Sequence, residues 1–211
     1  KLMLADIDAF LARLSEEHPQ QPLMLIGNCW GAKACAHIAR DDYVPERGRK
    51  VKLSGLVLIA PAISTLADVD LMTKVKIAFF HFVGGEARFP IPLKPSMFTK
   101  NSRYLSFIER DPLRLTEATA DFFVATFVLG ILAQKAAGNI RLPLLVLQGG
   151  KDEIVDPQRI REWFDRTSAE DKTMRVFPET AHSIDFDENS FREYAHLLGE
   201  WILARSQVAA Q

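Results

Sequence analysis

Residues 23–40 read LMLIGNCWGAKACAHIAR, and this stretch decides the fold class of the chain. Its first four residues are apolar and predict a short buried strand, whereas the alanine-rich pattern over residues 30–40 predicts a helix. Between them, Gly27 and Gly31 flank Cys29 in a G-x-C-x-G turn. A strand that turns sharply into a helix in this way is a nucleophile elbow, which holds its middle side chain on a strained turn at the top of a sheet. Because both glycines are small enough to let strand and helix approach, we predict that Cys29 is presented at the positive end of a helix.

The chain on either side of this turn alternates strand and helix patterns. The apolar runs are nearly continuous, which is typical of parallel strands that are covered by helices on both faces. Right-handed crossovers connect successive strands in such sheets, so we predict an α/β fold with a parallel sheet flanked by helices. The expected helices cover residues 4–17, 158–167 and 190–203, and the expected further strands cover residues 51–59, 143–147 and 173–177.

The strand–helix rhythm stops after Pro61 for about 80 residues, although connections in compact domains usually span roughly 2–6. We predict a core made of residues 1–63 and 141–211, with residues 64–140 inserted as a helical lid that includes a long helix near 116–134. The insertion is rich in phenylalanine, and two interpretations stay open. These side chains either pack the lid onto the core or form the wall of a substrate-binding pocket. The candidates for the wall are Phe79, Phe80, Phe123 and Phe127.

The composition of the 211 residues argues against several classes of function. A formal net charge of −1 without a basic run speaks against nucleic-acid binding. No uninterrupted apolar stretch reaches the roughly 20 residues of a membrane-spanning helix, so no transmembrane segment is expected. The two cysteines lie on different faces of one predicted helix, so we expect no disulfide and a reducing, cytoplasmic location. No zinc-type spacing or nucleotide-binding glycine motif occurs, so no metal or cofactor is expected, and Gly149-Gly150 is interpreted as a simple turn.

Two residues at the ends of later predicted strands complete a possible catalytic constellation with Cys29. Asp152 follows the third predicted strand, and His182 follows the fourth. The chain order of nucleophile, acid and base is the order found with nucleophile elbows, and open α/β sheets bind ligands at the carboxyl ends of their strands. In this hypothesis His182 takes the thiol proton, and Asp152 orients the imidazole. Asp156 is a competing acid, but its Asp-Pro sequence is typical of a helix N-cap.

Five segments of the sequence carry a resemblance to a known family: GNCWG (27–31), LVLIAPAI (56–63), IERDPLRLTEATADFF (108–123), LPLLVLQGGKDEIVD (142–156) and AHSIDF (181–186). Together they resemble the α/β-hydrolase superfamily, and within it the serine aminopeptidase S33-type branch of monoglyceride lipases and lysophospholipase-like enzymes. The resemblance implies a hydrolase of apolar acyl esters or thioesters that forms an acyl-enzyme, with Cys29 as nucleophile, Asp152 as acid and His182 as base. It also implies that the insertion is a lid over an acyl pocket, and that the backbone N–H of Trp30 is an oxyanion-hole donor.

Two departures from the family pattern lead to further expectations. Most members of that branch carry serine where this chain has Cys29, although cysteine occurs there in dienelactone hydrolases and polyhydroxyalkanoate synthases. Because a cysteine nucleophile gives a thioester, an acyltransferase or synthase that uses an alcohol acceptor is an alternative, and so is a non-catalytic ligand-binding protein. The family also has N-terminal strands before the first helix, which are absent from this chain. We expect a second chain, or a further part of the protein, to supply them, since natural sheets avoid a bare apolar edge.

Overall fold

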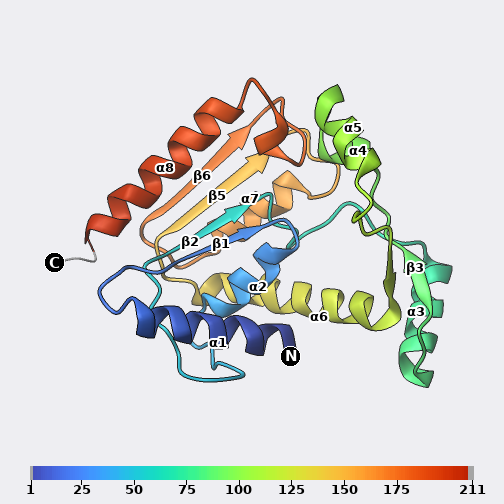
Figure 1. Ribbon diagram of the computed structural model, residues 1–211, viewed down its shortest axis with the longest axis horizontal. Coiled ribbons are helices and arrows are strands. Elements are labelled where there is room, and N and C mark those ends of the chain that lie inside the picture. The colour runs from blue at the N-terminus through green and yellow to red at the C-terminus, as the bar shows by residue number, and fades with distance from the viewer. Residues whose placement is uncertain (1, 209–211) are drawn as a thin grey trace.

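The computed structural model describes residues 2–208 and contains a parallel sheet (Figure 1). Four strands lie in the order β1 (Met24–Asn28), β2 (Gly55–Ile59), β5 (Leu144–Gly149) and β6 (Lys172–Phe177). Each strand pairs with its neighbour in parallel, and Leu58 at the centre lies opposite Gly27 on one side and Val146 on the other. The α/β fold class that the sequence predicted is therefore confirmed.

Both faces of this sheet are covered by helices: α1 (Leu2–Glu17), α2 (Gly31–Ile38), α6 (Ala120–Ala136), α7 (Pro157–Asp165) and α8 (Phe191–Val208). Successive residues of a strand point to opposite faces, so each strand contributes to two layers. Leu56 and Leu58 of β2 pack in the cluster formed with α2, α6 and α7. Val57 and Ile59 pack with Trp201 of α8 instead, which crosses the opposite face of the sheet (Figure 1).

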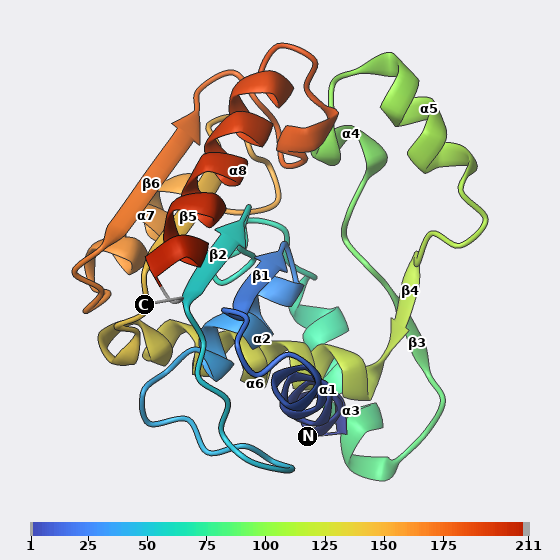
Figure 2. The same cartoon turned by 60° about the vertical axis from the view of Figure 1, so that its left-hand side comes forward.

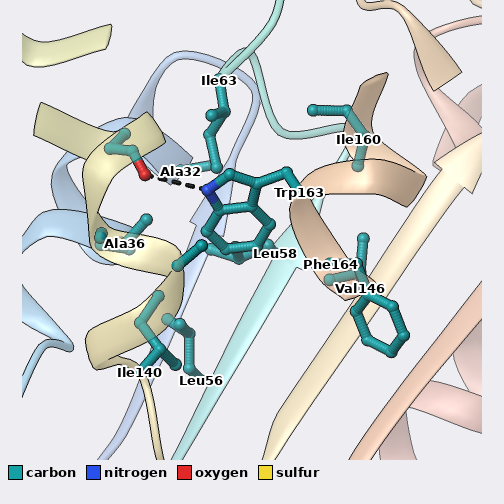
Figure 3. Packing of buried hydrophobic residues seen from close by; sticks show 14 of the residues in the cluster. Ala32, Ala36, Leu56, Leu58, Ile63, Ile140, Val146, Ile160, Trp163 and Phe164 are labelled. Atoms are coloured by element: carbon teal, nitrogen blue, oxygen red, sulfur yellow. Dashed lines mark hydrogen bonds between the residues drawn. The ribbon is translucent and has the colours of Figure 1, made fainter. Parts of the chain in front are cut away.

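Trp163 ties the helices of one face to each other and to the sheet (Figure 3). Its side chain is fully buried and lies with Leu58 and Ile63 in the same apolar cluster. The indole Nε1 donates a hydrogen bond of 2.9 Å to the carbonyl oxygen of Ala133 in α6. A buried indole N–H needs such a partner, because leaving it unpaired forfeits its hydration without compensation. α6 and α7 are therefore joined by a polar contact inside an apolar core.

The segment between β2 and β5 contains α3 (Leu71–Val83), β3 (Arg88–Pro90), α4 (Pro95–Phe98), α5 (Ser102–Arg110), β4 (Glu117–Thr119) and α6, followed by the 3-10 turn Ala137–Asn139. Strands β3 and β4 pair as a short antiparallel ribbon beside the main sheet (Figure 2). The sequence did not predict this ribbon, because three-residue strands are too short to show a period. α6 returns to pack against α2, and Ala133 and Ala136 near its end are fully buried in the core.

One helical stretch within residues 2–208, Ala120–Asn139, is long and apolar enough to cross a membrane by length and composition. Asp121 and Lys135 lie near the two ends of this stretch, so it contains no uninterrupted apolar run of about 20 residues. The expectation that no segment could span a membrane is thus not confirmed. In the fold, 33% of this stretch is buried, and α6 packs against α2 and α3.

Candidate active site

Cys29 lies on the tight turn between β1 and α2, with the backbone in the left-handed region at a φ of 50°. Residues other than glycine rarely adopt this conformation, and such strain persists where the surroundings fix it. The N–H of Cys29 donates to the carbonyl oxygen of Ile59 at 2.9 Å. Its own carbonyl oxygen accepts from the N–H of Ala32 at 3.2 Å and of Ala62 at 3.0 Å. The turn thus has the form of the predicted elbow, fastened to the end of the neighbouring strand.

The two glycines of the elbow have different roles. A β-carbon at Gly27 would lie 2.7 Å from the Cα of Ala32 and 2.8 Å from the Sγ of Cys35, so only glycine lets strand and helix approach this closely. A β-carbon at Gly31 would meet no atom within 4 Å. The prediction that both glycines are needed for the approach is therefore wrong for Gly31, which faces open space.

Asp152 and His182 form a buried pair at the carboxyl ends of β5 and β6. The Nδ1 of His182 is 2.8 Å from the Oδ2 of Asp152, and the two residues are 3% and 5% exposed. The other carboxylate oxygen, Oδ1, accepts from the backbone N–H groups of Ile154 at 2.8 Å and Val155 at 2.9 Å. A carboxylate fixed by backbone donors leaves one oxygen aimed at the imidazole, which sets the orientation of the ring.

Gly149 and Gly150 allow the loops that carry Asp152 and His182 to touch. A β-carbon at Gly149 would lie 2.1 Å from the carbonyl oxygen of Ala181, and one at Gly150 would lie 2.6 Å from that of Pro178. The backbone N–H of Gly150 donates to the carbonyl oxygen of Phe177 at 2.7 Å. Gly150 lies in a turn, as the sequence indicated. Both glycines also permit close backbone packing, and neither has a positive φ.

The structure separates Asp152 from its competitor and adds a residue that the sequence analysis missed. Asp156 caps α7, where its side chain accepts from the N–H groups of Gln158 and Arg159. The missed residue is Gln148, a fully buried amide at the end of β5 whose Nε2 donates to the Oδ2 of Asp152 at 2.9 Å. Gln148 is the single polar side chain in the strand LLVLQG, and a polar side chain in an apolar strand needs a buried partner, so the sequence did contain a signal for this residue.

The surroundings of His182 favour its protonated form. Burial alone lowers the pKa of His182, but the hydrogen bond to Asp152 and the neighbouring Cys29 sulfur outweigh burial and raise this pKa to about 9. The ring of Phe98 in α4 meets the imidazole edge-on at 5.6 Å, so the inserted segment covers the histidine. Among residues 2–208 the Nε2 of His182 is buried without a well-formed hydrogen bond, which leaves this nitrogen available for proton transfer.

A cavity of about 750 Å³ opens beside Cys29, between the elbow and the inserted segment. This volume is within the range of small-molecule sites. Two of the four predicted wall residues, Phe123 and Phe127, line it. Phe79 and Phe80 do not line it, because the helix that carries them, α3, contributes no residue to the cavity wall; Phe79 packs edge-on against Phe80, and Phe80 packs against Phe89.

Trp30 follows Cys29 and joins the elbow to α6. Its indole Nε1 donates to the Oγ1 of Thr126 at 3.0 Å, and its ring stacks on Phe122 with the centroids 5.6 Å apart. Within residues 2–208 the backbone N–H of Trp30 donates to no protein acceptor. An unoccupied donor beside Cys29 is the arrangement that an oxyanion hole requires.

A parallel sheet with a strained elbow after one strand, an acid and a histidine after two later strands, and an insertion between the second and third strands defines an α/β-hydrolase. Comparison with known families agrees with this class. Residues 1–189 match the family described as "Serine aminopeptidase, S33", and the chain belongs to that family.

The relatives within this family include monoglyceride lipases. The monoglyceride lipase of Mus musculus is 21% identical over 210 residues, which cover 90% of this chain and 65% of the mouse protein. The monoacylglycerol lipase of Paleococcus ferrophilus has the same fold, with a TM-score of 0.82, 21% identity and coverage of 97% of this chain and 75% of that chain. A soluble variant of the monoglyceride lipase from Saccharomyces cerevisiae gives a TM-score of 0.80 at 18% identity, and the match covers 96% of this chain and 69% of the yeast chain. The monoglyceride-lipase-like branch predicted from the sequence is confirmed, and the chain spans 65% of the length of its mouse relative.

Proposed function

We propose that this chain carries the catalytic residues of a hydrolase that cleaves apolar acyl esters or thioesters. The observation that carries the proposal is the hydrogen-bonded pair of His182 and Asp152 beside Cys29 on its strained turn. A nucleophile, a base and an acid that orients the base are the parts that covalent acyl transfer requires. The names of the relatives, which are lipases, point to the same class of reaction.

In the first half of the proposed reaction, His182 holds the proton taken from the Cys29 thiol, and the resulting thiolate sulfur attacks the carbonyl carbon of the ester. The raised pKa of His182 keeps a proton on the imidazole at neutral pH, and Nε2 gives that proton to the departing alcohol oxygen. The carbon–oxygen bond breaks, and the acyl group stays on Cys29 as a thioester. The Nδ1–H of His182 donates to Asp152 throughout, while the N–H of Trp30 stabilises the negative oxygen of the tetrahedral intermediate.

In the second half, the neutral imidazole of His182 takes a proton from water through Nε2. The resulting hydroxide adds to the thioester carbonyl, and the carbon–sulfur bond breaks. The carboxylic acid leaves, and Cys29 and His182 return to their starting states. An alcohol in place of water would give a new ester by the same steps, so hydrolysis and acyl transfer differ only in the acceptor.

The cavity supports an apolar acyl chain as substrate. Its wall is formed largely by apolar side chains of the insertion and of the loop after β2, among them Ile63, Leu93, Phe123 and Phe127. Burial of methylene groups against such a wall contributes about 0.8 kcal/mol each, so affinity is expected to rise with chain length until the cavity is full.

The free edge of the sheet supports the proposal that further strands complete the fold. Among residues 2–208, β1 pairs only with β2, and Ile26 on this strand is 47% exposed. Unpaired edges of this kind attract another strand. We propose that strands from a second chain, or from another part of the protein, cover β1 and supply a second oxyanion donor. Slow hydrogen exchange of the β1 amides in the natural protein would agree with this, and fast exchange would contradict it.

The triad can be tested with a matched control for each member. Cys29→Ala, Asp152→Asn and His182→Ala are compared with Cys35→Ala, Asp156→Asn and His196→Ala, which replace the same residue types away from the cavity. Each variant is incubated with p-nitrophenyl esters of several chain lengths, and both p-nitrophenol release and the intact mass are followed. We expect the triad variants to lose about 10³-fold or more in activity and the controls to stay within about three-fold.

The acyl adduct decides between the functions considered. An adduct that maps to Cys29 and requires His182 supports the proposed mechanism, and its loss to glycerol rather than to water would identify acyl transfer. If wild-type protein binds the esters without an adduct or product, the catalytic proposal is wrong and the chain belongs to a ligand-binding protein. Equal losses in a triad variant and its control would show that the named residue has no special role.

A further inference from the structure

Lys33 is a buried cation that the proposed reaction does not use. It lies in α2 one helical turn beyond Cys29, and both residues line the same cavity. Lys33 is only 6% exposed. Its ammonium points toward α6, where Gly130 leaves room for it: a β-carbon at Gly130 would lie 3.6 Å from the Nζ. The side chain therefore ends inside the site rather than in solvent.

Within residues 2–208 no group of the protein pairs with this ammonium. Lys33 takes part in no side-chain hydrogen bond and no ion pair. Acidic side chains on the cavity wall are engaged elsewhere: Asp68 pairs with Lys74, and Glu162 accepts from Gln158. Burial lowers the pKa of Lys33, whereas the nearby Cys29 sulfur acts in the opposite direction. A charge held away from bulk water is costly without a partner, and this ammonium faces the cavity rather than the sealed core, so an anion bound in the cavity could pair with it.

Other buried polar side chains of the chain show what a purely structural role looks like. Asp8 is buried to a similar extent, and its carboxylate accepts from the hydroxyl of Tyr43 at 3.0 Å and from the N–H of Glu46 at 2.7 Å. Lys33 differs from Asp8 because its charge faces a cavity and, among residues 2–208, finds no partner.

We propose that Lys33 determines substrate specificity by binding an anionic group, a carboxylate or a phosphate, on an otherwise apolar ester. This inference rests on the proposed function, since it names the class of substrate that the same cavity takes. One helical turn separates Cys29 from Lys33, a rise of roughly 6 Å, so the anion lies close to the scissile ester. An ammonium offers three donors to such a group, and the apolar wall strengthens the contact by excluding water.

The test uses two pairs of esters that differ only in the anion. Mono-p-nitrophenyl adipate is compared with p-nitrophenyl hexanoate, which places the charge on the acyl side. Hexanoylglycerol 3-phosphate is compared with hexanoylglycerol, which places it on the alcohol side. For the anionic member of one pair, Lys33→Met should lower kcat/KM by roughly 10- to 100-fold, mainly through KM, with little change for the neutral member. Lys33→Arg should keep most of the discrimination, and Lys33→Gln provides a second neutral variant.

Lys76→Met is the matched control, because Lys76 in α3 is an exposed lysine that does not line the cavity. It should change neither pair by more than about three-fold. If Lys33→Met lowers the rates on neutral and anionic esters equally, Lys33 acts through Cys29 and the inference is wrong. The same follows if Lys76→Met lowers the anionic preference as much as Lys33→Met does.

A binding measurement separates failure of this inference from failure of the proposed function. The Cys29→Ala protein, with and without Lys33→Met, is titrated with decanoate and with 1-decanol by calorimetry. Tighter binding of decanoate that Lys33→Met abolishes supports the anion site even when no ester is turned over. Equal binding of the two probes overturns the inference while leaving the catalytic proposal to the adduct experiment.

Discussion

Replacing Gly149 by alanine should disturb the site through the backbone alone. The added methyl group would lie 2.1 Å from the carbonyl oxygen of Ala181 and 2.7 Å from that of Thr180. Both are main-chain atoms, so neither can move aside by rotating a side chain. The loop that carries His182 has to shift by about 1 Å or more to restore van der Waals contact. The 2.8 Å hydrogen bond between His182 and Asp152 is the interaction that this shift breaks.

The magnitude follows from two opposing effects. Overpacking of a filled site costs about 1–3 kcal/mol, while replacing glycine by alanine recovers about 0.4–1 kcal/mol by restricting the unfolded chain. We expect a net loss of about 1–2 kcal/mol in the free energy of unfolding. Loss of the Asp152 contact should lower the pKa of His182 from about 9 toward its ordinary value of 6.5. A displacement of about 1 Å should reduce turnover by about 100-fold.

Gly199→Ala is the matched control, because a β-carbon there meets nothing within 4 Å in the middle of α8. It should leave the site unchanged and stabilise the protein slightly, by about 0.5–1 kcal/mol. Urea unfolding gives the stability of both variants, and NMR titration of the imidazole protons gives the pKa of His182. The reasoning is refuted if Gly149→Ala keeps this pKa near 9 and is as stable as the control.

Three further expectations concern the core, the pH dependence and the cysteines. Trp163→Ala should lower the free energy of unfolding by about 3–5 kcal/mol, because it opens a large cavity and loses the hydrogen bond to Ala133. Trp163→Phe loses the same hydrogen bond but fills most of the space, so it should cost clearly less, with about 1 kcal/mol from the hydrogen bond itself. Equal costs in urea unfolding would contradict this. The raised pKa of His182 stabilises the folded protein fully below pH 6.5, and this contribution is lost as the pH rises through about 9. The free energy of unfolding of the wild type, relative to that of His182→Gln, should therefore fall by at most about 3 kcal/mol between these pH values. Parallel stability–pH curves for the two proteins would be evidence against the pairing of His182 with Asp152. Iodoacetamide should alkylate Cys29 in the native protein and spare Cys35, whose burial raises its pKa to about 12; labelling of both at similar rates, read by peptide mass mapping, would show that the core is open.

Local patterns were enough to predict the sheet and to select Cys29, Asp152 and His182 as candidates for one site. Residues 23–40 carry a strand, a turn and a helix within one short stretch, and Asp152 and His182 each follow a strand whose apolar run stands out. In a parallel sheet these strand ends meet at one edge, so the chain order already brought the candidates together. The pairing of His182 with Asp152 rather than Asp156 followed from the position of each residue relative to its strand and helix.

Features that depend on contacts between distant segments could not be predicted in this way. Gly149 looked like a turn residue, because the loop that presses on it comes from beyond β6. Lys33 lies in an alanine-rich helix whose sequence pattern does not indicate that α6 packs over it and buries it. Phe79 and Phe127 carry the same side chain in two helices of the same insertion, and the sequence contains no sign of which of these helices borders the cavity.

α6 is part of both the cavity wall and the core of the sheet. Phe123 and Phe127 in its first half line the cavity, while Ala133 and Ala136 near its end are fully buried beside the sheet. A ligand that orders the first part therefore also restrains the second, because a single helix connects them. Occupancy of the site should consequently be felt as thermal stability, rising by RT ln(1 + [L]/Kd), which is about 2.7 kcal/mol at a hundred-fold excess over Kd. The folding stability of such a protein and the concentration of its ligand are thermodynamically linked, so a change in ligand supply changes the fraction of folded chain.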